Sequence, residues 1–255
     1  FMLEINEIFG PTIQGEGKLV GTPSVFIRFG KCNFSCEGFG VEYETPSGVK
    51  KCACDTYYAV DTEFKDTWTK YKTYEEIVFE VDKLISIYPY NYKIDIVITG
   101  GEPLLYWNKK EFQKLLEHYI KAGHKVTIET NASLNLNFEY DYQKELLFSM
   151  SVKLSNSLEP LKKRVNINTL TAILTNTKES YLKFVIGKDF LNDAKQEINQ
   201  IISTIPKCDV YLMPLGDTAE EINKNCEDVI NMSIENGFKY CDRLHIRVWD
   251  NKRGV

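Results

Sequence analysis

Apolar residues along the chain recur with two different periods, one typical of strands and the other typical of helices. Short apolar runs that end in glycine or polar residues predict buried strands. These runs occupy residues 24–30, 93–100, 124–131, 148–155, 181–187, 208–216 and 243–249. Between them, apolar residues spaced three or four positions apart predict amphipathic helices at 73–88, 109–123, 190–206 and 218–238. Strands and helices therefore alternate along most of the chain.

The expected helices have recognisable ends and consistent apolar faces. Thr73 with Glu76, and Thr218 with Glu221, match the capping-box pattern, in which side chains accept the free backbone N–H groups of the first turn. Gly123 is expected to end the second helix. The inward faces of the first two helices would be Ile77, Val81, Leu84, Ile85 and Tyr88, then Phe112, Leu115, Leu116, Tyr119 and Ile120.

Alternating strands and helices favour a parallel α/β sheet or barrel. About seven strands are fewer than a full eight-unit barrel contains, so we expect an incomplete, TIM-like α/β barrel. No internal repeat or low-complexity linker interrupts the chain, and we therefore expect a single domain over residues 1–255.

Polar and unusual residues follow several of the expected strands. They are Cys32, the Gly100-Gly101-Glu102 turn, Glu129-Thr130-Asn131, Lys153 and Met213-Pro214. In parallel α/β folds, reactive groups gather at the carboxyl ends of the strands. These residues should therefore converge on one rim of the sheet.

Composition narrows the possible functions. The 255 residues are 43% hydrophobic and 26% charged, enough to bury one sizeable core. A net charge of −5 predicts no general attraction to nucleic acid, and the absence of about 18 consecutive apolar residues predicts no membrane span. The first residues lack the basic start and apolar core of a signal peptide. We therefore expect a cytoplasmic, reducing environment, where clustered cysteines more often bind metals or do chemistry than form disulfides.

Four of the seven cysteines gather between residues 31 and 60. Three residues lie between Cys32 and Cys36, whereas a single residue separates Cys52 from Cys54. Thiolates hold zinc or iron–sulfur clusters, but the tighter spacing fits the usual zinc knuckle poorly. A cluster held by three cysteines would leave one iron open to a substrate or cofactor. The alternative is that one pair packs in the interior and the other is incidental.

Several stretches, in order along nearly the whole chain, resemble one enzyme family. Cys-x3-Cys, a later Cys-Asp-Thr and the strand-end "TGGEP" resemble the radical S-adenosylmethionine (SAM) superfamily, although 17 residues instead of the usual two precede the third cysteine. Together with "EIFGPTIQGEGKLVGTPSVFIRFGKCN", "ETNA" and "LHIRVWDNKRGV", they resemble the 7-carboxy-7-deazaguanine synthases. The resemblance implies a partial radical SAM barrel with an expanded cluster-binding loop at residues 31–60, opened by an insertion at 37–53.

The resemblance assigns the ligands of a [4Fe-4S] cluster to Cys32, Cys36 and Cys54, because the family's third cysteine directly precedes Asp-Ser or Asp-Thr. Cys52 remains a rival for Cys36 or Cys54, and we expect it to be a bystander. Thr56 occupies the family's Mg²⁺ position. Without the resemblance, an ordinary turn threonine would be the preferred interpretation of Thr56.

The resemblance also divides residues between two ligands. SAM would contact Ala53, Asp55, Gly100, Gly101, Glu102, Glu129, Asn131, Ser151, Lys153 and Met213. The substrate would contact Ile13, Gln14, Gly15, Glu16, Arg28, Thr99, His245 and Val255, the last through its terminal carboxylate. We expect Glu102 to accept a hydrogen bond from the SAM ammonium group. An inward Arg28 would pair with the substrate carboxylate, although strand alternation is equally compatible with an outward Arg28.

The implied reaction converts 6-carboxy-5,6,7,8-tetrahydropterin to 7-carboxy-7-deazaguanine. A 5′-deoxyadenosyl radical from SAM would take a hydrogen from C6, the ring would contract and ammonia would leave. No side chain is a certain catalyst, and Glu16 is a candidate.

Expected partners are the pterin substrate, a flavodoxin- or ferredoxin-type electron donor and a second copy in a homodimer, with neither nucleic acid nor membrane. Two alternatives stay open: an activase that makes a glycyl radical on a protein partner, and a zinc-stabilised binding module without enzymatic activity.

Overall fold

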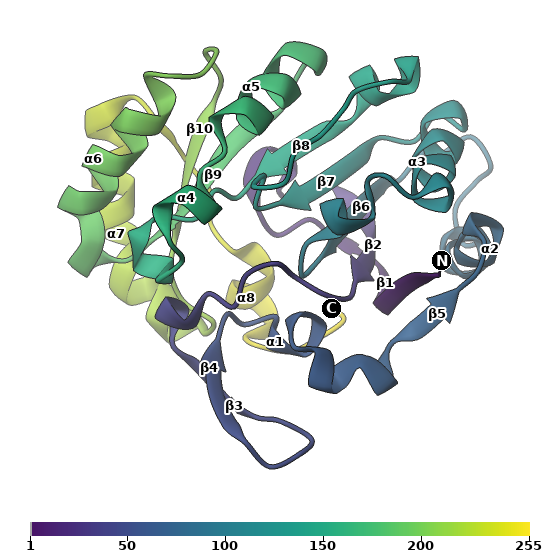
Figure 1. The fold of residues 1–255 in the computed structure, drawn as a ribbon, viewed down its shortest axis with the longest axis horizontal. Helices are drawn as coiled ribbons and strands as arrows, with labels where there is room; N and C mark the ends of the chain where they lie inside the picture. The colour runs from purple at the N-terminus through teal and green to yellow at the C-terminus, as the bar shows by residue number, and fades with distance from the viewer. Residues whose placement is uncertain (1) are drawn as a thin grey trace.

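A mixed sheet of nine strands runs through the computed structural model, which describes residues 2–255 (Figure 1). The strands are β1 (Leu3–Ile13), β2 (Pro23–Phe29), β5 (Thr69–Tyr71), β6 (Asp95–Gly100), β7 (Val126–Thr130), β8 (Leu147–Met150), β9 (Tyr181–Ile186), β10 (Val210–Pro214) and β11 (Lys239–Tyr240). Their spatial order is β11-β10-β9-β8-β7-β6-β2-β1-β5. From β2 through β11 neighbouring strands are parallel, whereas β1 is antiparallel to both β2 and β5.

The parallel strands follow one another across the sheet in chain order, as they do around an α/β barrel. The sheet does not close, because β11 and β5 each have a single neighbour. The expected incomplete barrel is therefore confirmed. This arrangement brings the carboxyl ends of the parallel strands to one edge of the molecule, where a site can form.

Long helices follow the strands and lie at the periphery of the molecule (Figure 1). They are α2 (Tyr74–Ile85), α3 (Lys110–Lys121), α5 (Ile167–Asn176), α6 (Leu191–Ile202) and α7 (Ala219–Asn236). Three short helices are α1 (Tyr57–Val60), α4 (Leu161–Arg164) and α8 (Leu244–Trp249). Figure 1 shows α1, α8 and the C-terminus on the inner side of this ring of helices. None of the helices described between residues 2 and 255 has the length and apolar character that crossing a bilayer requires.

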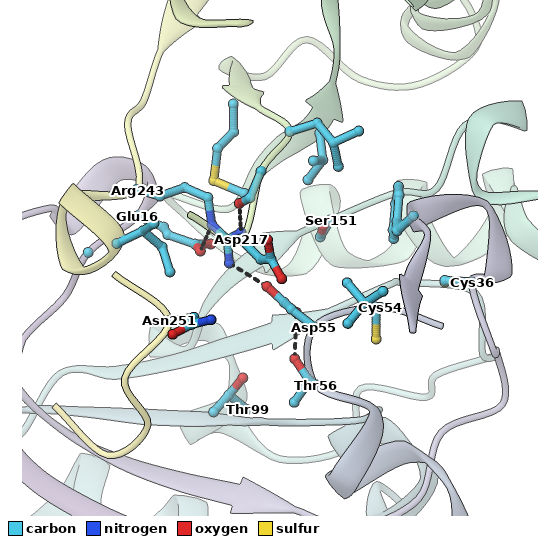
Figure 2. A pocket seen from close by; sticks show the side chains of 18 of the residues that line it. Glu16, Cys36, Cys54, Asp55, Thr56, Thr99, Ser151, Asp217, Arg243 and Asn251 are labelled. Atoms are coloured by element: carbon cyan, nitrogen blue, oxygen red, sulfur yellow. Dashed lines mark hydrogen bonds and ion pairs between the residues drawn. The ribbon is translucent and has the colours of Figure 1, made fainter. Parts of the chain in front are cut away.

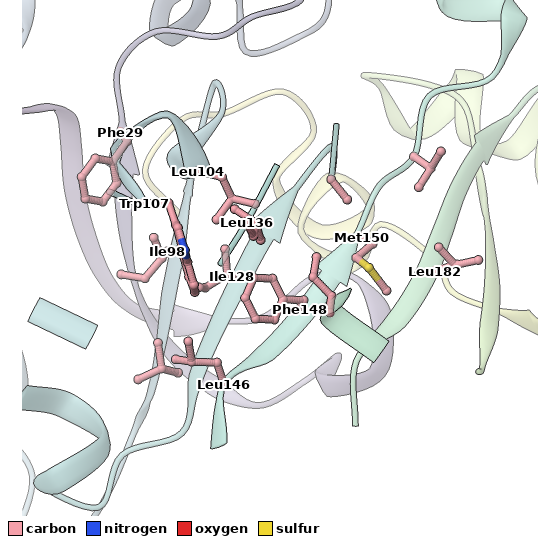
Figure 3. Close-up of a cluster of buried hydrophobic side chains, with 14 of the residues drawn as sticks. Phe29, Ile98, Leu104, Trp107, Ile128, Leu136, Leu146, Phe148, Met150 and Leu182 are labelled. Atoms are coloured by element: carbon pink, nitrogen blue, oxygen red, sulfur yellow. The ribbon is translucent and has the colours of Figure 1, made fainter. Parts of the chain in front are cut away.

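The core lies between the sheet and the outer helices (Figure 3). Successive strands contribute Ile98, Ile128, Phe148 and Leu182, all of them fully buried. Because these strands are covered by protein, they read as nearly continuous apolar runs in the sequence. Trp107 closes one end of this layer and donates from its indole N–H to the carbonyl of residue 137 at 3.0 Å.

The four helices expected from the apolar periodicity are present as α2, α3, α6 and α7, each slightly shorter than predicted. The first capping box forms, whereas the second forms in half, because the Glu221 carboxylate accepts the backbone N–H of Asp217 instead of that of Thr218. The Glu76 carboxylate accepts the backbone N–H of Thr73 at 3.3 Å, and the Thr218 hydroxyl accepts the backbone N–H of Glu221 at 3.2 Å. These contacts fix where α2 and α7 begin.

The strand predicted at residues 243–249 is wrong, because these residues form helix α8. Leu244, Ile246 and Val248 alternate with polar residues and so imitate a strand. In the structure Ile246 is buried, whereas Val248 is 56% exposed. The neighbour of β10 is instead the two-residue strand β11. Residues 243–249 therefore do not pair with the sheet, and Leu244–Trp249 form a helix.

Three elements lacked a clear sequence signal. β1 includes the "PTI" of a glycine-rich stretch and pairs with β2 through two irregularities in register. α5 carries asparagine and threonine, which are weak helix formers. The insertion at 37–53 folds into an antiparallel hairpin, β3 (Val41–Glu44) and β4 (Lys50–Ala53), which projects from the body of the molecule (Figure 1).

Candidate active site

A cavity of about 1030 Å³ lies at the carboxyl ends of the parallel strands. The predicted site residues that line it are Ile13, Gln14, Gly15, Glu16, Arg28, Cys32, Cys36, Cys54, Asp55, Thr56, Thr99, Gly100, Gly101, Glu129, Asn131, Ser151, Lys153, Met213, His245 and Val255. Figure 2 shows several of them converging from different segments. Ala53 and Glu102 are the two predicted site residues that do not line it. The rim expected from the strand ends is therefore a single cavity.

Three cysteines of the cluster-binding loop line this cavity. Cys32 follows β2, Cys36 adopts a left-handed backbone with φ of 52°, and Cys54 follows β4. The backbone N–H of Phe34 donates to the Cys32 sulfur at 3.4 Å. The Glu159 carboxylate accepts the backbone N–H of Cys36 at 3.0 Å. Glu159 therefore holds the loop at Cys36 through the backbone and not through the thiol.

The three thiols lie close enough to influence one another's ionisation. Burial, together with the nearby Asp55 and Cys36, raises the pKa of Cys54 to about 12. Burial also raises the pKa of Cys32 and Cys36 above the ordinary thiol value, and both other cysteines contribute to the rise at Cys32. Iron binding would therefore displace protons from all three thiols.

The arrangement suits a cluster better than a single ion. Within residues 2–255, no three Cys, His, Asp or Glu side chains converge as the ligands of one metal ion would. The cysteines of an iron–sulfur cluster bind different irons, so they need only surround a shared space. Cys32, Cys36 and Cys54 meet that condition, since all three line the same cavity.

Cys52 lies apart from the other three cysteines. It is on β4, does not line the cavity, and its thiol donates to the carbonyl of Glu37 at 3.5 Å. Successive residues of a strand point to opposite faces, so residues two apart share a face. Cys52 and Cys54 would therefore share a face only if the strand included both of them. β4 ends at Ala53, and Cys54 turns away into the cavity.

Gly100 and Gly101, which the resemblance places next to SAM, are also required as glycines by the packing of the backbone around them. A Cβ on Gly100 would lie 2.2 Å from the carbonyl oxygen of Phe29, and one on Gly101 would lie 2.2 Å from that of Lys31. The backbone N–H of Gly101 donates to Phe29 at 3.1 Å. The glycines therefore allow the turn after β6 to pack directly on the start of the cluster-binding loop.

The Glu102 side chain does not reach the cavity, in contrast to its expected contact with SAM. It is fully buried, and its carboxylate accepts the Thr130 hydroxyl at 2.6 Å, the Asn131 backbone N–H at 2.7 Å and the Leu104 backbone N–H at 3.0 Å. These bonds join the turn after β6 to the end of β7. We therefore assign the Glu102 carboxylate the role of fixing Thr130 and Asn131 rather than a ligand contact.

Arg28 points into the cavity, but it already has an anionic partner. Its Nε donates to Glu7 Oε1 at 2.7 Å, and its guanidinium lies over the rings of Phe9 and Tyr58. Glu7 on β1 therefore supplies an anionic partner for Arg28 within the protein, and the pairing of Arg28 with the substrate carboxylate stays a prediction. The terminal nitrogens of Arg28 make no hydrogen bond within the described residues and still border the cavity.

Glu129 lies among residues expected to bind substrate. Gln14 donates to Glu129 Oε1 at 3.2 Å, and the Thr99 hydroxyl donates to Glu129 Oε2 at 2.9 Å. On the other side of β8, Lys153 donates to the carbonyl of Ser151 at 2.9 Å and to its hydroxyl at 3.0 Å. The structure thus associates Glu129 with Gln14 and Thr99, while Ser151 and Lys153 form a separate wall.

A chain of alternating charges crosses the cavity. Lys183 on β9 donates to Glu16 Oε2 at 2.5 Å, and Arg243 donates to Glu16 Oε1 at 3.0 Å. Arg243 also donates to Asp55 Oδ2 at 2.7 Å, and the Thr56 hydroxyl donates to Asp55 Oδ1 at 2.9 Å (Figure 2). The chain connects the N-terminal segment to the cluster-binding loop.

This network controls the charge of Glu16. Burial alone would raise the pKa of Glu16, but Lys183 and Arg243 overcome that effect and hold it well below the usual value. Conversely, burial would lower the pKa of Lys183, and Glu16 raises it far above the usual lysine value. Both groups are therefore charged at neutral pH, and Glu16 is an acceptor with both oxygens already oriented.

Helix α8 packs directly on the residues Ile13–Glu16, which we call the substrate segment. The backbone N–H of Leu244 donates to the carbonyl of Gly15 at 2.9 Å. A Cβ at Gly15 would lie 2.0 Å from His245 Nδ1, so only glycine permits this approach. Burial lowers the pKa of His245, while Glu16 partly opposes the shift. His245 therefore faces the cavity mainly as a neutral imidazole.

Lys183 and Arg243 were missed by the sequence reasoning. Lys183 is 4% exposed within the apolar strand "YLKFVIG", and a charged residue inside such a run was an available signal, because burial of an unpaired charge is costly. Arg243 had no comparable signal, since its neighbourhood was interpreted as a strand.

Comparisons with known proteins give consistent results. No protein-family model matches the chain. A 7-carboxy-7-deazaguanine synthase from Rhodopirellula baltica is 31% identical over 255 residues, covering 95% of this chain and 85% of the relative. Relatives with the same description from Rickettsia prowazekii and Halobacterium salinarum are 30% and 29% identical, covering 95% and 98% of this chain and 86% and 91% of their own lengths.

Solved structures show the same fold. The crystal structure of QueE from Escherichia coli superimposes with a TM-score of 0.62, covering 96% of this chain and 95% of that chain at 19% identity. Streptococcus suis SuiB matches with a TM-score of 0.52, and covers 87% of this chain but 48% of that chain. The open barrel with three cysteines in the cavity at its strand ends is the arrangement that the sequence resemblance led us to expect of a radical SAM enzyme. The sequence relatives at 30% identity or more over nearly the full length show that the chain belongs to the 7-carboxy-7-deazaguanine synthase family.

Proposed function

We propose that this chain is a radical SAM lyase that converts 6-carboxy-5,6,7,8-tetrahydropterin to 7-carboxy-7-deazaguanine and ammonia, a step of queuosine and other deazapurine biosynthesis. One observation carries the proposal: the three cysteines and the substrate segment face the same cavity in a chain that belongs to this family. A reaction between two bound molecules requires both to be held within reach of each other, and a shared cavity provides that.

The family implies a [4Fe-4S] cluster and SAM. Cys32, Cys36 and Cys54 would hold the cluster through three irons, leaving the fourth for SAM. Bound together, these groups would supply the radical chemistry that removes a hydrogen from the substrate. The chain's own contribution is to orient the ligands and to exclude water from the cavity.

The SAM side of the cavity would comprise the backbone of Gly100 and Gly101, with Asn131, Ser151 and Lys153 around it. Asp55 and Met213 would complete this side. The Lys153 ammonium, which borders the cavity next to Cys36, is the suitable partner for the SAM carboxylate. Glu102 would act indirectly through Asn131, whose backbone N–H it fixes.

The substrate side would comprise the substrate segment with Arg28, Thr99 and His245. Pterin rings present N–H donors, and the anionic Glu16 and Glu129 are the available acceptors on this side. Our assignment of Glu129 moves it from the SAM side to the substrate side, because Gln14 and Thr99 hold both of its oxygens. The terminal nitrogens of Arg28 would donate hydrogen bonds to the substrate carboxylate, with Glu7 keeping the guanidinium in place.

Mg²⁺ is proposed at Thr56. The Thr56 hydroxyl and the Asp55 carboxylate are hard oxygen ligands that border the cavity 2.9 Å from each other. Mg²⁺ commonly uses one or two protein oxygens and completes its shell with substrate and water. Calorimetric titration of Mg²⁺ into protein with and without substrate would detect such a shared site.

Four further proposals concern the electron donor, the oligomeric state, the compartment and the domain organisation. A flavodoxin- or ferredoxin-type donor would supply the electron at the cluster-binding loop. The protein would work as a homodimer in a reducing, cytoplasmic compartment, and as a single domain over residues 1–255. Light scattering on the purified protein measures the oligomeric state directly.

The decisive experiment is an anaerobic assay with reconstituted protein, SAM, reductant and the tetrahydropterin. The proposal expects 7-carboxy-7-deazaguanine and ammonia in equal amounts, with iron and sulfide bound to the protein. A glycyl-radical activase would instead cleave SAM without using the pterin, and a zinc module would bind zinc and lack visible absorption. Loaded protein that makes no product from the pterin would overturn the proposal.

A further inference from the structure

We propose that Arg243 is a positioning residue that holds the substrate segment and the cluster-binding loop in one fixed geometry; this inference rests on the proposed function. Every nitrogen group of its guanidinium has a different partner. Nε donates to Glu16 at 3.0 Å, one terminal nitrogen donates to Asp55 at 2.7 Å, and the other donates to the carbonyl of Gly216 at 2.5 Å. Three separate segments thus meet on a single side chain (Figure 2).

The contacts use a property that only arginine has. Its guanidinium is planar and presents donors in fixed directions, whereas a lysine ammonium is a compact charge on a flexible stem. Glu16 and Asp55 accept from two different nitrogens of this rigid group, and Glu16 comes from the N-terminal segment whereas Asp55 directly follows Cys54. A lysine at position 243 could neutralise either carboxylate, but it could not hold the two carboxylates in a fixed position relative to each other.

The interaction lies in a protected environment. The side chains of Arg243 and Glu16 are 12% and 14% exposed, and both charges lie against the cavity. Removing one partner of such a buried pair leaves the other charge without compensation and forces the segment that carries it to move. Without Arg243, Asp55 would lose its cationic partner and Glu16 would keep Lys183, so the residues after Cys54 and Gly15–Glu16 would no longer be held to a common side chain.

Helix α8 strengthens the link, because Arg243 is the residue that precedes its first turn. Leu244 donates its backbone N–H to Gly15, and His245 packs against the same glycine. The substrate segment and α8 therefore form one unit, and Arg243 connects that unit to Asp55 on the cofactor side. None of these contacts requires Arg243 itself to touch the reacting atoms.

The functional consequence concerns the distance between two bound molecules. Hydrogen transfer from substrate to a SAM-derived radical depends steeply on their relative placement. Loss of the link should weaken substrate binding and let SAM be cleaved without product formation. A residue that only stabilised the fold would instead lower the amount of active enzyme and leave these ratios unchanged.

The test compares Arg243→Gln and Arg243→Lys with Arg247→Gln. Arg247 lies one helical turn further along α8, pairs with Asp242 at 3.0 Å, and does not line the cavity, so it is a matched control. Reconstituted holoenzyme of each variant is assayed for kcat and KM, and for SAM cleaved per product formed. Calorimetry without reductant measures the affinity for the pterin when no turnover occurs. It therefore tests the substrate side of the cavity independently of kcat.

We expect Arg243→Gln to weaken pterin affinity and raise KM by about tenfold or more, and to increase SAM cleavage per product several-fold. Arg243→Lys should recover affinity in part but not the coupling ratio, while Arg247→Gln stays within about twofold of the wild type. Unchanged affinity, KM and coupling in Arg243→Gln would overturn the inference. If that variant does not fold, Arg243→Lys with wild-type coupling would overturn it equally. A wild-type enzyme that makes no product would point to failure of the proposed function instead.

Discussion

The carboxylate of Glu159 accepts a hydrogen bond from the backbone N–H of Cys36 at 3.0 Å, across 123 residues of sequence. The same carboxylate accepts the backbone N–H of Ser35 at 2.8 Å and pairs with Lys163 at 3.0 Å. The segment between β8 and α4 therefore fixes the part of the cluster-binding loop in which Cys36 adopts its left-handed backbone.

Glu159→Ala should loosen this loop. Hydrogen bonds to a charged acceptor contribute about 1.5–3 kcal/mol each, and the variant would remove this acceptor from the N–H of Ser35 and from the buried N–H of Cys36. We expect a lower free energy of unfolding and incomplete iron loading, measured by urea denaturation and by iron and sulfide analysis. Glu37→Gln, a change of an exposed acid in the same loop, is the control and should load normally. Full iron content and unchanged stability in Glu159→Ala would contradict this role.

The cysteine assignments predict opposite results for two neighbouring positions. Cys54→Ser should lose the iron–sulfur cluster, because it removes one of the three thiols that line the cavity. Cys52→Ser should keep its iron and its visible absorption, because the Cys52 thiol contacts the Glu37 carbonyl outside the cavity. Iron analysis and absorption spectra after anaerobic reconstitution distinguish the two variants. The reverse pattern would reassign the third ligand to Cys52.

Gly15→Ala should damage the substrate side without unfolding the protein. The new methyl would overlap His245 Nδ1 at 2.0 Å and push α8 from the substrate segment. Overpacking of this kind costs about 1–3 kcal/mol, which corresponds to roughly tenfold or more in kcat/KM if it is expressed at the site. Gly187→Ala is the control, since its methyl would meet no atom closer than 3.5 Å. Equal kcat/KM for both variants would argue against close packing at Gly15.

We expect Asp95 to contribute to the pH dependence of the free energy of unfolding. Burial raises the pKa of Asp95 to about 7 from 3.8, although the Thr127 hydroxyl lowers it in part. The folded protein thus binds this proton more tightly than the unfolded chain does. The resulting stabilisation is fully present below about pH 4 and is lost as the pH rises through 7.

Asp95→Asn should remove that component, because asparagine carries no titrating proton. The free energy of unfolding of the wild type should fall between pH 5 and pH 8 relative to the variant, by at most about 4 kcal/mol for a shift of this size. Urea denaturation at both pH values measures the difference. Asp66→Asn, a change of an exposed aspartate, should keep the wild-type slope. Parallel slopes for Asp95→Asn and wild type would show that Asp95 titrates normally.

We expect the activity to be sensitive to residues appended at the C-terminal end of the chain. Gly254 and Val255 line the cavity, and Arg253 anchors this segment by donating to the Tyr57 hydroxyl at 2.8 Å and lying over the Tyr58 ring. Residues appended after Val255 would remove its carboxylate from the cavity and should lower kcat/KM, whereas the same tag before Met2 should not. Comparing the two tagged proteins in the same assay measures the effect. Intact kcat/KM with the C-terminal tag would count against a substrate role for Val255.

The elements that were predicted correctly have strong local signals. The strand before Cys32 and the strand that ends at Gly100 are apolar because nearly all of their residues are buried, so the run of residues alone identifies them. Helices α2 and α3 combine an apolar face with clear ends. The stretch at 243–249 failed because alternation over seven residues fits a strand and a half-buried helix equally well, and only the pairing of β10 with β11 decides between them.

Some features of the candidate site could likewise be predicted from the sequence, whereas others could not. Cysteine spacing, the glycine turn and the strand-end residues can be recognised along the chain, since chemistry restricts residue types at those positions. Partners cannot be recognised in this manner. Glu7 for Arg28, Lys183 and Arg243 for Glu16, and Glu159 for Cys36 all come from distant segments.

The sequence by itself determined the alternation of strands and helices, the cysteines available for a cluster, and the family to which these patterns point. The tertiary structure decided which side chains face the cavity and which charges neutralise one another. It placed Glu102 beneath the cavity, Cys52 outside it and Arg243 across it. The physical reason is that periodicity and residue chemistry are local properties, whereas burial and charge pairing depend on contacts between segments that only the folded chain brings together.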